Sequence, residues 1–253
     1  MARLCLVFAL AVLVFARTGL GQDDVADVLS REIKIGGDPN KTYFLIHPKD
    51  DAKPPEQGFS LLLILPGGDG SADFHPFVKR IYKHALSEQY LVAQLVSVRW
   101  NADQQIIWPQ KKDPLPNMKF TTEQFIEGVV KDVEKAYKVN PRHVFTMSWS
   151  SSGPATYAAS LQKKKSITGS YIVMSVFFPE KLPPLRGAKG YPYYIEHSPD
   201  DKVCAFSLAE SARDLLTKSK AVVEFSTYPG GHTWPPDVYA RVQKAVKWLK
   251  DHS

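Results

Sequence analysis

Cysteine is almost absent from this 253-residue sequence, which contains only Cys5 and Cys204. Cys5 lies within the first 21 residues, so a chain that lost this segment would keep Cys204 alone. An internal disulfide would then be excluded, even in an oxidising compartment. The folded chain must therefore be stabilised by its hydrophobic core.

Long apolar runs are also missing. The longest, residues 4–16, is shorter than the roughly 20 residues that cross a bilayer. It follows the basic Arg3 and precedes Gly19-Leu20-Gly21, the layout of a cleavable secretory signal. We therefore expect residues 1–21 to be a signal peptide and the chain to be secreted or periplasmic. A permanent anchor is the weaker alternative, and no stable membrane insertion is expected after cleavage.

The sequence has no concentrated excess of charge of one sign. Without Arg3 and Arg17 the formal net charge falls from +6 to +4, and the remaining basic residues are scattered except at residues 163–165. A nucleic-acid site needs a basic stripe with stacking aromatics, so no nucleic-acid partner is expected. The hydrophobic share of 44% and the charged share of 23% are ordinary for a globular protein. Residues 22–253 suit a single domain.

Strand and helix patterns alternate along these residues. Segments 31–35 and 42–46 flank a turn rich in Gly, Pro and Asn, which predicts an antiparallel pair, and the continuously apolar segment 59–65 predicts a strand covered on both faces. Further strands are expected at 91–98, 144–147, 169–177, 193–196 and 222–228, and helices at 77–86, 121–139, 154–162, 208–217 and 238–252. This order predicts a three-layer α/β/α sandwich with a doubly wound, mostly parallel sheet of about eight strands. Reactive groups should lie in the loops after the strands.

The most informative of these loops follows the strand near residue 147. Residues 143–154 (HVFTMSWSSSGP) lead from an apolar strand through small residues into a helix. This stretch resembles the G-x-S-x-G nucleophile elbow of α/β-hydrolases, whose tight turn needs small residues two positions before and after the Ser. Ser148 and Ser152 stand in place of the two glycines, and Gly153 follows. The pattern therefore indicates Ser150 as the nucleophile.

Two alternatives to Ser150 follow from the same residues. Ser151 is the competing nucleophile, although a motif centred there would place the bulky Trp149 where a small residue is needed. A Ser-rich helix cap, with Pro154 in the first turn, is the purely structural interpretation.

A Ser hydroxyl needs a base to remove its proton, and an acid and a His do follow in the sequence. Residues 193–203 run from a strand into a turn that resembles the H-G-x-x-D-x-V segment of the same superfamily. Matching His197-Ser198 to H-G makes Asp201 the acid. Asp200 is the rival, with turn capping as its structural interpretation.

The base is expected after the last strand. Residues 225–234 place His232 in a loop at that point. A lone loop His is usually a surface residue, but the order Ser, Asp, His is the order of α/β-hydrolases.

The glycine turn at residues 65–70 (LPGGDG) resembles the family's HGGG-type loop, although Pro66 stands where many relatives carry His. By this comparison the amide of Gly68, or of Asp69, would pair with that of Ser151 to form an oxyanion hole. A simple tight turn is the alternative.

Substrate contacts are less clearly marked. Residues 99–109 follow a buried strand and are expected to line an acyl or alcohol pocket, where tryptophans could stack on a sugar or aromatic group, or instead pack against the protein body. The candidate substrate contacts are Asp69, Trp100, Trp108, Trp149 and Trp234. His75 and His84 lack metal-ligand spacing, and Cys204 has the character of a small buried residue. No metal is expected.

Taken together, these motifs resemble the secreted serine esterases of the α/β-hydrolase superfamily. The branch concerned is related to polyhydroxybutyrate depolymerases, feruloyl and acetylxylan esterases, and phospholipase/carboxylesterase-like proteins. The resemblance implies cofactor-free hydrolysis of carboxylic esters through an acyl-enzyme, with Ser150, His232 and Asp201 as the triad.

The resemblance also implies a small-molecule or polymer-linked ester as substrate. No long insertion marks a large cap, so we expect an open site for short acyl groups or polymer side chains. A small serine peptidase and a noncatalytic binding protein on the same scaffold are the alternatives. The sequence leaves the oligomeric state open.

Overall fold

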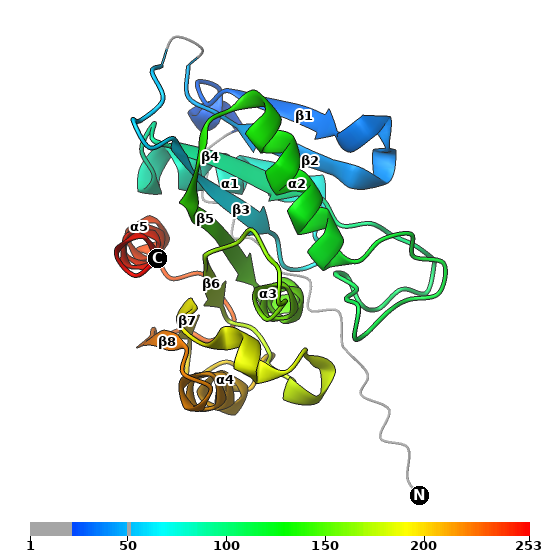
Figure 1. Cartoon of the computed structure of the whole chain (residues 1–253). Helices are drawn as coiled ribbons and strands as arrows, with labels where there is room; N and C mark the ends of the chain where they lie inside the picture. Colours follow the sequence, from blue (N-terminus) through cyan, green and yellow to red (C-terminus); the bar gives the residue numbers. More distant parts are fainter. Residues whose placement is uncertain (1–21, 50–51) are drawn as a thin grey trace, which may run out of the picture.

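An eight-stranded sheet forms the middle layer of the computed structural model, which describes residues 22–49 and 52–253 (Figure 1). The predicted signal peptide, residues 1–21, lies outside them. The spatial order is β1-β2-β4-β3-β5-β6-β7-β8; β2 is antiparallel to β1 and β4, and the other neighbours are parallel. The strands are β1 (Ser30–Lys34), β2 (Thr42–Ile46), β3 (Phe59–Leu65), β4 (Tyr90–Leu95), β5 (Val139–Trp149), β6 (Gly169–Val173), β7 (Pro192–His197) and β8 (Val222–Thr227).

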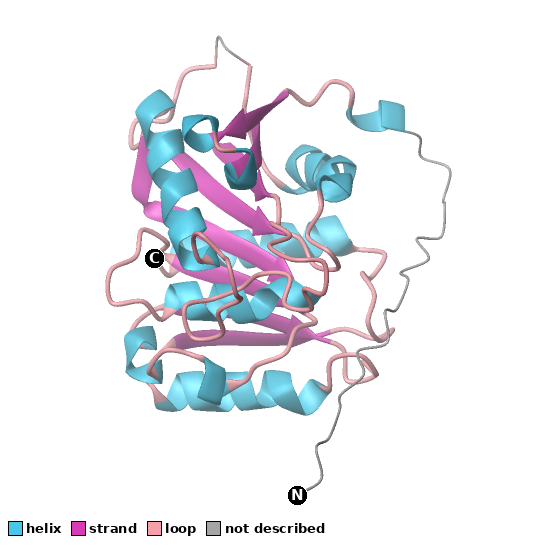
Figure 2. Ribbon diagram, turned by 90° about the vertical axis from the view of Figure 1, so that its right-hand side faces the viewer, coloured by secondary structure: helices cyan, strands magenta, loops and turns pink. Residues whose placement is uncertain are grey.

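Helices cover both faces of this sheet (Figure 2). Helices α1 and α5 supply side chains to the core on one face, and α2, α3 and α4 supply the core on the other. The helices are α1 (His75–Ala85), α2 (Thr122–Ala136), α3 (Gly153–Ser160), α4 (Phe206–Lys218) and α5 (Val238–Asp251). The predicted three-layer arrangement with a mostly parallel, doubly wound sheet is confirmed.

The apolar strand β3 shows why the sheet has two cores. Leu61, Leu63 and Leu65 point into the core beneath α2 and α3, whereas Leu62 and Ile64 point into the core beneath α1 and α5. Successive side chains of a strand point to opposite faces, so a strand covered on both sides must be apolar at every position. None of the helices in the described residues has the length and apolar character needed to cross a membrane.

Some element boundaries differ from the sequence prediction. Strand β6 ends at Val173 instead of residue 177 because Met174 has a φ of 41°, which turns the chain away from the sheet. Helix α2 ends before Tyr137, whose backbone is extended. The predicted Thr121–Gln124 capping box is present at its start. Strand β5 begins at Val139 instead of residue 144, since Val139 already pairs with Phe59 before an irregularity in the register.

A buried ion pair attaches α5 to the sheet. The Glu196 side chain on β7 is 2% exposed, and its carboxylate accepts a 2.6 Å hydrogen bond from Arg241 of α5 and a 2.5 Å bond from the Tyr171 hydroxyl. Burial, together with the Glu196 carboxylate, raises the pKa of Tyr171 well above its ordinary value, so Tyr171 remains a donor. The pair therefore joins α5 to β7, the strand that precedes the turn containing Asp201.

We expect Arg241→Met to lower the free energy of unfolding by about 3 kcal/mol, because the Glu196 carboxylate would stay buried without its cationic partner. Lys247→Met in the same helix is the matched control. It removes an exposed pair with Asp251 and should cost less than about 1 kcal/mol. Urea unfolding of both variants measures the difference, and equal losses would contradict the structural role of the buried pair.

Candidate active site

A sharp turn joins β5 to α3. Strand β5 ends at Trp149, Ser150 adopts a left-handed backbone with a φ of 54°, and one turn of 3₁₀ helix (Ser150–Ser152) leads into α3 at Gly153. A positive φ is uncommon for a residue with a side chain and persists only when the surroundings enforce it. The strand therefore projects the Ser150 side chain out of the sheet edge.

Small residues around Ser150 make room for this turn. A Cβ on Gly153 would lie 1.9 Å from the Ser175 hydroxyl oxygen, and one on Gly67 would lie 2.5 Å from the Trp149 side chain. The Ser175 hydroxyl donates a 2.6 Å hydrogen bond to the carbonyl of Ser150, which fixes the turn from the neighbouring strand end. Both glycines are thus required by close approach.

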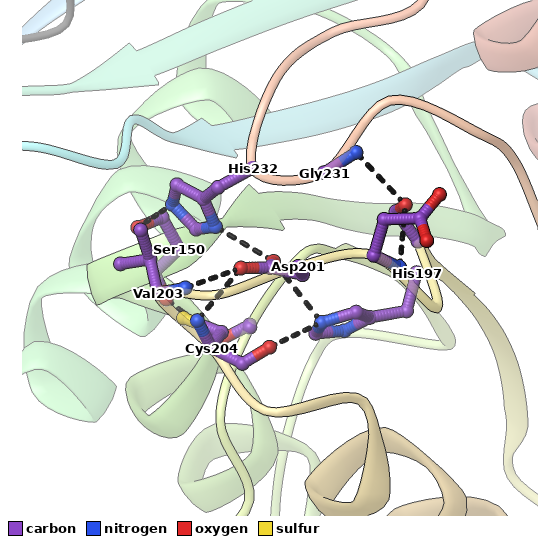
Figure 3. Close-up of polar contacts among 10 residues, drawn as sticks. Ser150, His197, Asp201, Val203, Cys204, Gly231 and His232 are labelled. Carbon is purple, nitrogen blue, oxygen red and sulfur yellow. Dashed lines mark hydrogen bonds and ion pairs between the residues drawn. The ribbon is translucent and has the colours of Figure 1, made fainter.

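Ser150, His232 and Asp201 form one hydrogen-bonded chain at this edge of the sheet (Figure 3). Ser150 Oγ lies 3.0 Å from His232 Nε2, and His232 Nδ1 lies 2.7 Å from Asp201 Oδ2. A carboxylate only accepts, so Nδ1 carries the proton and Nε2 is left to accept from the Ser150 hydroxyl. This arrangement allows His232 to remove the proton of Ser150.

The Asp201 carboxylate is buried but surrounded by donors. Its Oδ1 accepts 2.8 Å bonds from the amides of Val203 and Cys204, and its Oδ2 is contacted by His232 and by His197. Burial acts to raise the pKa of Asp201, but the hydrogen bonds from His197, His232 and the two amides outweigh it and hold the pKa below its ordinary value. Asp201 is therefore an anion at neutral pH.

The structure also places the two competing residues. The Ser151 hydroxyl donates a 2.8 Å bond to the carbonyl of Gly68, so it is turned away from His232. Asp200 is exposed, and its backbone amide donates to Ser198 Oγ at 3.2 Å. The residues that meet His232 are Ser150 and Asp201, as the sequence motifs predicted.

The glycine turn after β3 lies beside the elbow. The Ser151–Gly68 hydrogen bond joins the two loops, and Gly68 is exposed with a φ of 58°. A Cβ on Gly68 would meet the Phe74 ring at 3.2 Å. The Asp69 side chain accepts a 3.0 Å bond from the amide of Ser71. The Ser151 side chain and the Gly68 backbone are therefore in contact at this edge of the sheet.

Two of the four tryptophans named as candidate substrate contacts, Trp108 and Trp149, are buried. Trp108 is 2% exposed and donates its indole N–H to the carbonyl of Pro66 at 3.0 Å, and Trp149 is 3% exposed, packed edge-on against Phe74 and Phe77. Both rings fill space beneath the loops and present no stacking face.

Trp100 and Trp234 are partly exposed. Trp100 packs edge-on against Phe120, and Trp234 contacts Phe77 and Trp149. Trp234 therefore lies over the aromatic cluster that supports the elbow, two residues from His232.

A cavity of about 280 Å³ opens beside the glycine turn. Three residues of the segment 99–109 line this cavity, and its two tryptophans do not. The lining consists of Asp69, Ser71 and Ala72, of residues 96–99, and of Gln104 and Ile107.

Among the described residues, Asp201, Cys204 and His232 bring three potential metal-ligand atoms within 4.8 Å of one another. Metal binding would need the Cys204 thiolate, but burial and the Asp201 charge raise the pKa of Cys204 to about 12. It would also break the hydrogen bond between His232 and Asp201. The chemistry of this cluster favours proton transfer over metal binding.

The fold of the chain occurs in known structures. A Bacillus cereus carboxylesterase superposes with a TM-score of 0.59 at 16% identity, covering 83% of this chain and 94% of its own. A thermostable Pseudomonas putida esterase superposes with a TM-score of 0.64 at 13% identity, covering 89% and 82%. The chain has the α/β-hydrolase fold. At these identities the likeness establishes the fold alone.

Sequence comparison adds a short match to a curated protein. An acyl-protein thioesterase from Neurospora crassa is 37% identical over 65 residues, which is 25% of this chain and 26% of the relative. The match thus spans about a quarter of that protein's length. No protein-family model matches the chain.

Sequence reasoning missed three polar side chains at this site. His197 contacts Asp201, the Ser198 hydroxyl accepts a 2.9 Å bond from the amide of Gly231, and Ser175 contacts the Ser150 carbonyl. His197 and Ser198 were aligned to a family motif, and their position beside the acid was the available signal. No sequence signal marked Ser175, because it follows β6 and lies outside the motifs.

We expect Asp201→Asn to destabilise the chain most at neutral pH. Because the pKa of Asp201 in the folded chain lies below 3.8, its ionised form stabilises the fold above that pH, and the stabilisation is lost as the pH falls through the folded pKa. The exposed Asp200→Asn is the matched control. Thermal or urea unfolding from pH 7 to pH 2 measures the effect, and an Asp201→Asn deficit that does not shrink with falling pH would contradict it.

Proposed function

We propose that this chain is a serine hydrolase that cleaves carboxylic esters through an acyl-enzyme. The observation that carries the proposal is the continuous relay from Ser150 Oγ through His232 to the buried Asp201, with Ser150 held at a left-handed turn. Known neighbours named as esterases, and the partial match to an acyl-protein thioesterase, support an ester or thioester substrate.

Acylation begins when His232 Nε2 removes the proton of Ser150 as Oγ bonds to the ester carbonyl carbon. The negative charge that develops on the carbonyl oxygen is stabilised by the amides of Gly68 and Ser151. His232 then protonates the leaving alcohol oxygen as the C–O bond breaks. Asp201 keeps the proton on His232 Nδ1 throughout and stabilises the transient imidazolium.

Deacylation repeats the same steps with water. His232 accepts a proton from the water as its oxygen bonds to the acyl carbon, and Ser150 leaves with the proton that His232 returns. The carboxylic acid product departs, and the resting hydrogen bonds re-form. Over the two steps, one ester and one water are consumed and one alcohol and one carboxylic acid are released.

We place a small acyl or alcohol group in the cavity beside the glycine turn, whose lining includes Asp69 next to Gly68. Its volume of about 280 Å³ lies at the small end of ligand pockets, and its lining includes the apolar Val96, Val98 and Ile107 together with the charged Asp69 and Arg99. We propose short acyl esters or esters attached to a polysaccharide or polyester as substrates. Export through residues 1–21 remains a prediction on residues outside those that the structure describes.

The nucleophile is tested by a fluorophosphonate probe followed by peptide mass spectrometry. We expect one adduct per chain on Ser150, because this is the hydroxyl that hydrogen-bonds His232 within the part of the chain that the structure describes. Ser150→Ala should abolish the adduct, whereas the neighbouring Ser151→Ala, which keeps its backbone amide, should retain it. Absence of an adduct on folded protein would favour a noncatalytic binding protein over a hydrolase.

Substrate class is tested with a series of p-nitrophenyl esters and a peptide panel. We expect kcat/KM to be highest for acetate and butyrate and to fall at least tenfold for palmitate, since the cavity is small. A preference for palmitate would overturn the short-acyl proposal. Cleavage of peptides without ester cleavage would favour a serine peptidase.

A further inference from the structure

A second buried histidine contacts the acid of the triad. His197 is the last residue of β7, its side chain is 1% exposed, and its ring packs edge-on near Phe206 of α4. Its Nε2 lies 3.1 Å from Asp201 Oδ2 and 2.8 Å from the carbonyl oxygen of Cys204 (Figure 3). The triad mechanism described above does not use this ring.

The two neighbours of His197 Nε2 determine where its proton lies. A carbonyl oxygen only accepts hydrogen bonds, and so does an ionised carboxylate. His197 Nε2 must therefore carry a hydrogen; this nitrogen lies 2.8 Å from the Cys204 carbonyl oxygen, its hydrogen-bond acceptor, and 3.1 Å from Asp201 Oδ2. His197 is thus a fixed donor to the same carboxylate oxygen that receives His232 Nδ1–H.

These contacts hold the Asp201 carboxylate in one orientation. Oδ1 is held by the amides of Val203 and Cys204, and Oδ2 is held between His197 and His232. Rotation of the carboxylate would break bonds on both oxygens. Without His197, Asp201 Oδ2 would keep His232 as its hydrogen-bond partner among the described residues.

Ser198, the residue after His197, contacts the loop that carries His232. Ser198 Oγ accepts the amide of Gly231 at 2.9 Å, and Gly231 directly precedes His232. Adjacent residues at the end of β7 thus contact both Asp201 and the loop that carries His232.

We propose that His197 is a positioning residue whose Nε2–H fixes Asp201 Oδ2 toward His232 and shares the charge of the carboxylate. The inference rests on the proposed serine hydrolase function. His197 touches no reacting atom, and its effect reaches Ser150 only through Asp201 and His232.

The other titratable side chains around Asp201 do not supply this charge sharing. Burial and Asp201 raise the pKa of Cys204 to about 12, and burial together with Asp201 and Glu196 raises the pKa of Tyr228 above its ordinary value. Both are neutral across the working range of a His-dependent hydrolase. The Tyr228 hydroxyl has no hydrogen-bond partner among the described residues.

The test compares His197→Ala, His197→Gln and the control His143→Gln. His197→Ala removes the donor, whereas Gln places an amide N–H close to the position of Nε2. His143 is also partly buried and hydrogen-bonded, but it lies in β5 seven residues before Ser150, roughly 20 Å along the strand. Fluorophosphonate labelling rates, kcat and KM from pH 5 to pH 9, and thermal unfolding are measured for each variant.

We expect His197→Ala to lower kcat about tenfold or more with little change in KM, because a hydrogen bond to a charged group is lost in a relay that acts during chemistry. The acidic limb of the rate profile should move to higher pH, since a carboxylate with fewer donors attracts the His232 proton more strongly. His197→Gln should restore most of the rate and of the profile. His143→Gln should leave both unchanged.

Three results would overturn the positioning role: an unshifted rate profile in folded His197→Ala, no recovery in folded His197→Gln, or an NMR tautomer assignment in wild-type protein that leaves Nε2 of His197 without a proton. The NMR measurement decides the matter if the Ala variant does not fold. Failure of the proposed function is distinguishable, because wild-type Ser150 would then not react with the fluorophosphonate at all.

Discussion

The left-handed backbone of Ser150 is the constraint on which the site depends. A side chain at a φ of 54° costs of order 1–3 kcal/mol, and the fold supplies the compensation locally. Strand β5 is paired on both sides, Gly67 and Gly153 leave space that a Cβ would fill, and Ser175 binds the Ser150 carbonyl. Relaxing the turn into regular helix or strand would move the hydroxyl away from His232. The strain is therefore part of how the Ser150 hydroxyl is held toward His232.

The parallel sheet brings the partners of Ser150 to the same edge. Strands β3, β5, β7 and β8 run in one direction, so the glycine turn, the elbow, the acid turn and the base loop follow their carboxyl ends side by side. Ser150 and His232 are 82 positions apart in the chain yet 3.0 Å apart in space. Burial of Asp201 then sets the electrostatics, because a carboxylate with four N–H contacts stays ionised and orients His232.

Much of this could be predicted from the sequence, because the order of elements follows from patterns of local residues. The run at β3 is apolar at every position, which indicates a doubly covered strand, and the small residues around Ser150 indicate a tight turn. Side-chain burial in long loops depends on distant partners and was not predictable. Trp108 is buried because the Pro66 carbonyl lies within reach of its indole N–H, and neither residue signals the other along the chain. The motif places His197 near Asp201 in the sequence, but its contacts with Asp201 and the Cys204 carbonyl depend on how residues 198–204 fold.

Three serines occupy positions where the resembling motifs have glycine, and their hydroxyls have different consequences. Ser152 Oγ donates to the Leu65 carbonyl at 2.6 Å and accepts from the amide of Trp149, which ties the elbow to β3. Ser198 Oγ ties the acid turn to the base loop through Gly231. Ser148 Oγ is buried with no hydrogen-bond partner among the described residues, so only its small size serves the turn. At Ser152 and Ser198, serine in place of glycine therefore adds a hydrogen bond between neighbouring segments of the site. A motif that requires glycine at these positions would treat Ser152 and Ser198 as mismatches, although their hydroxyls make hydrogen bonds that glycine could not make.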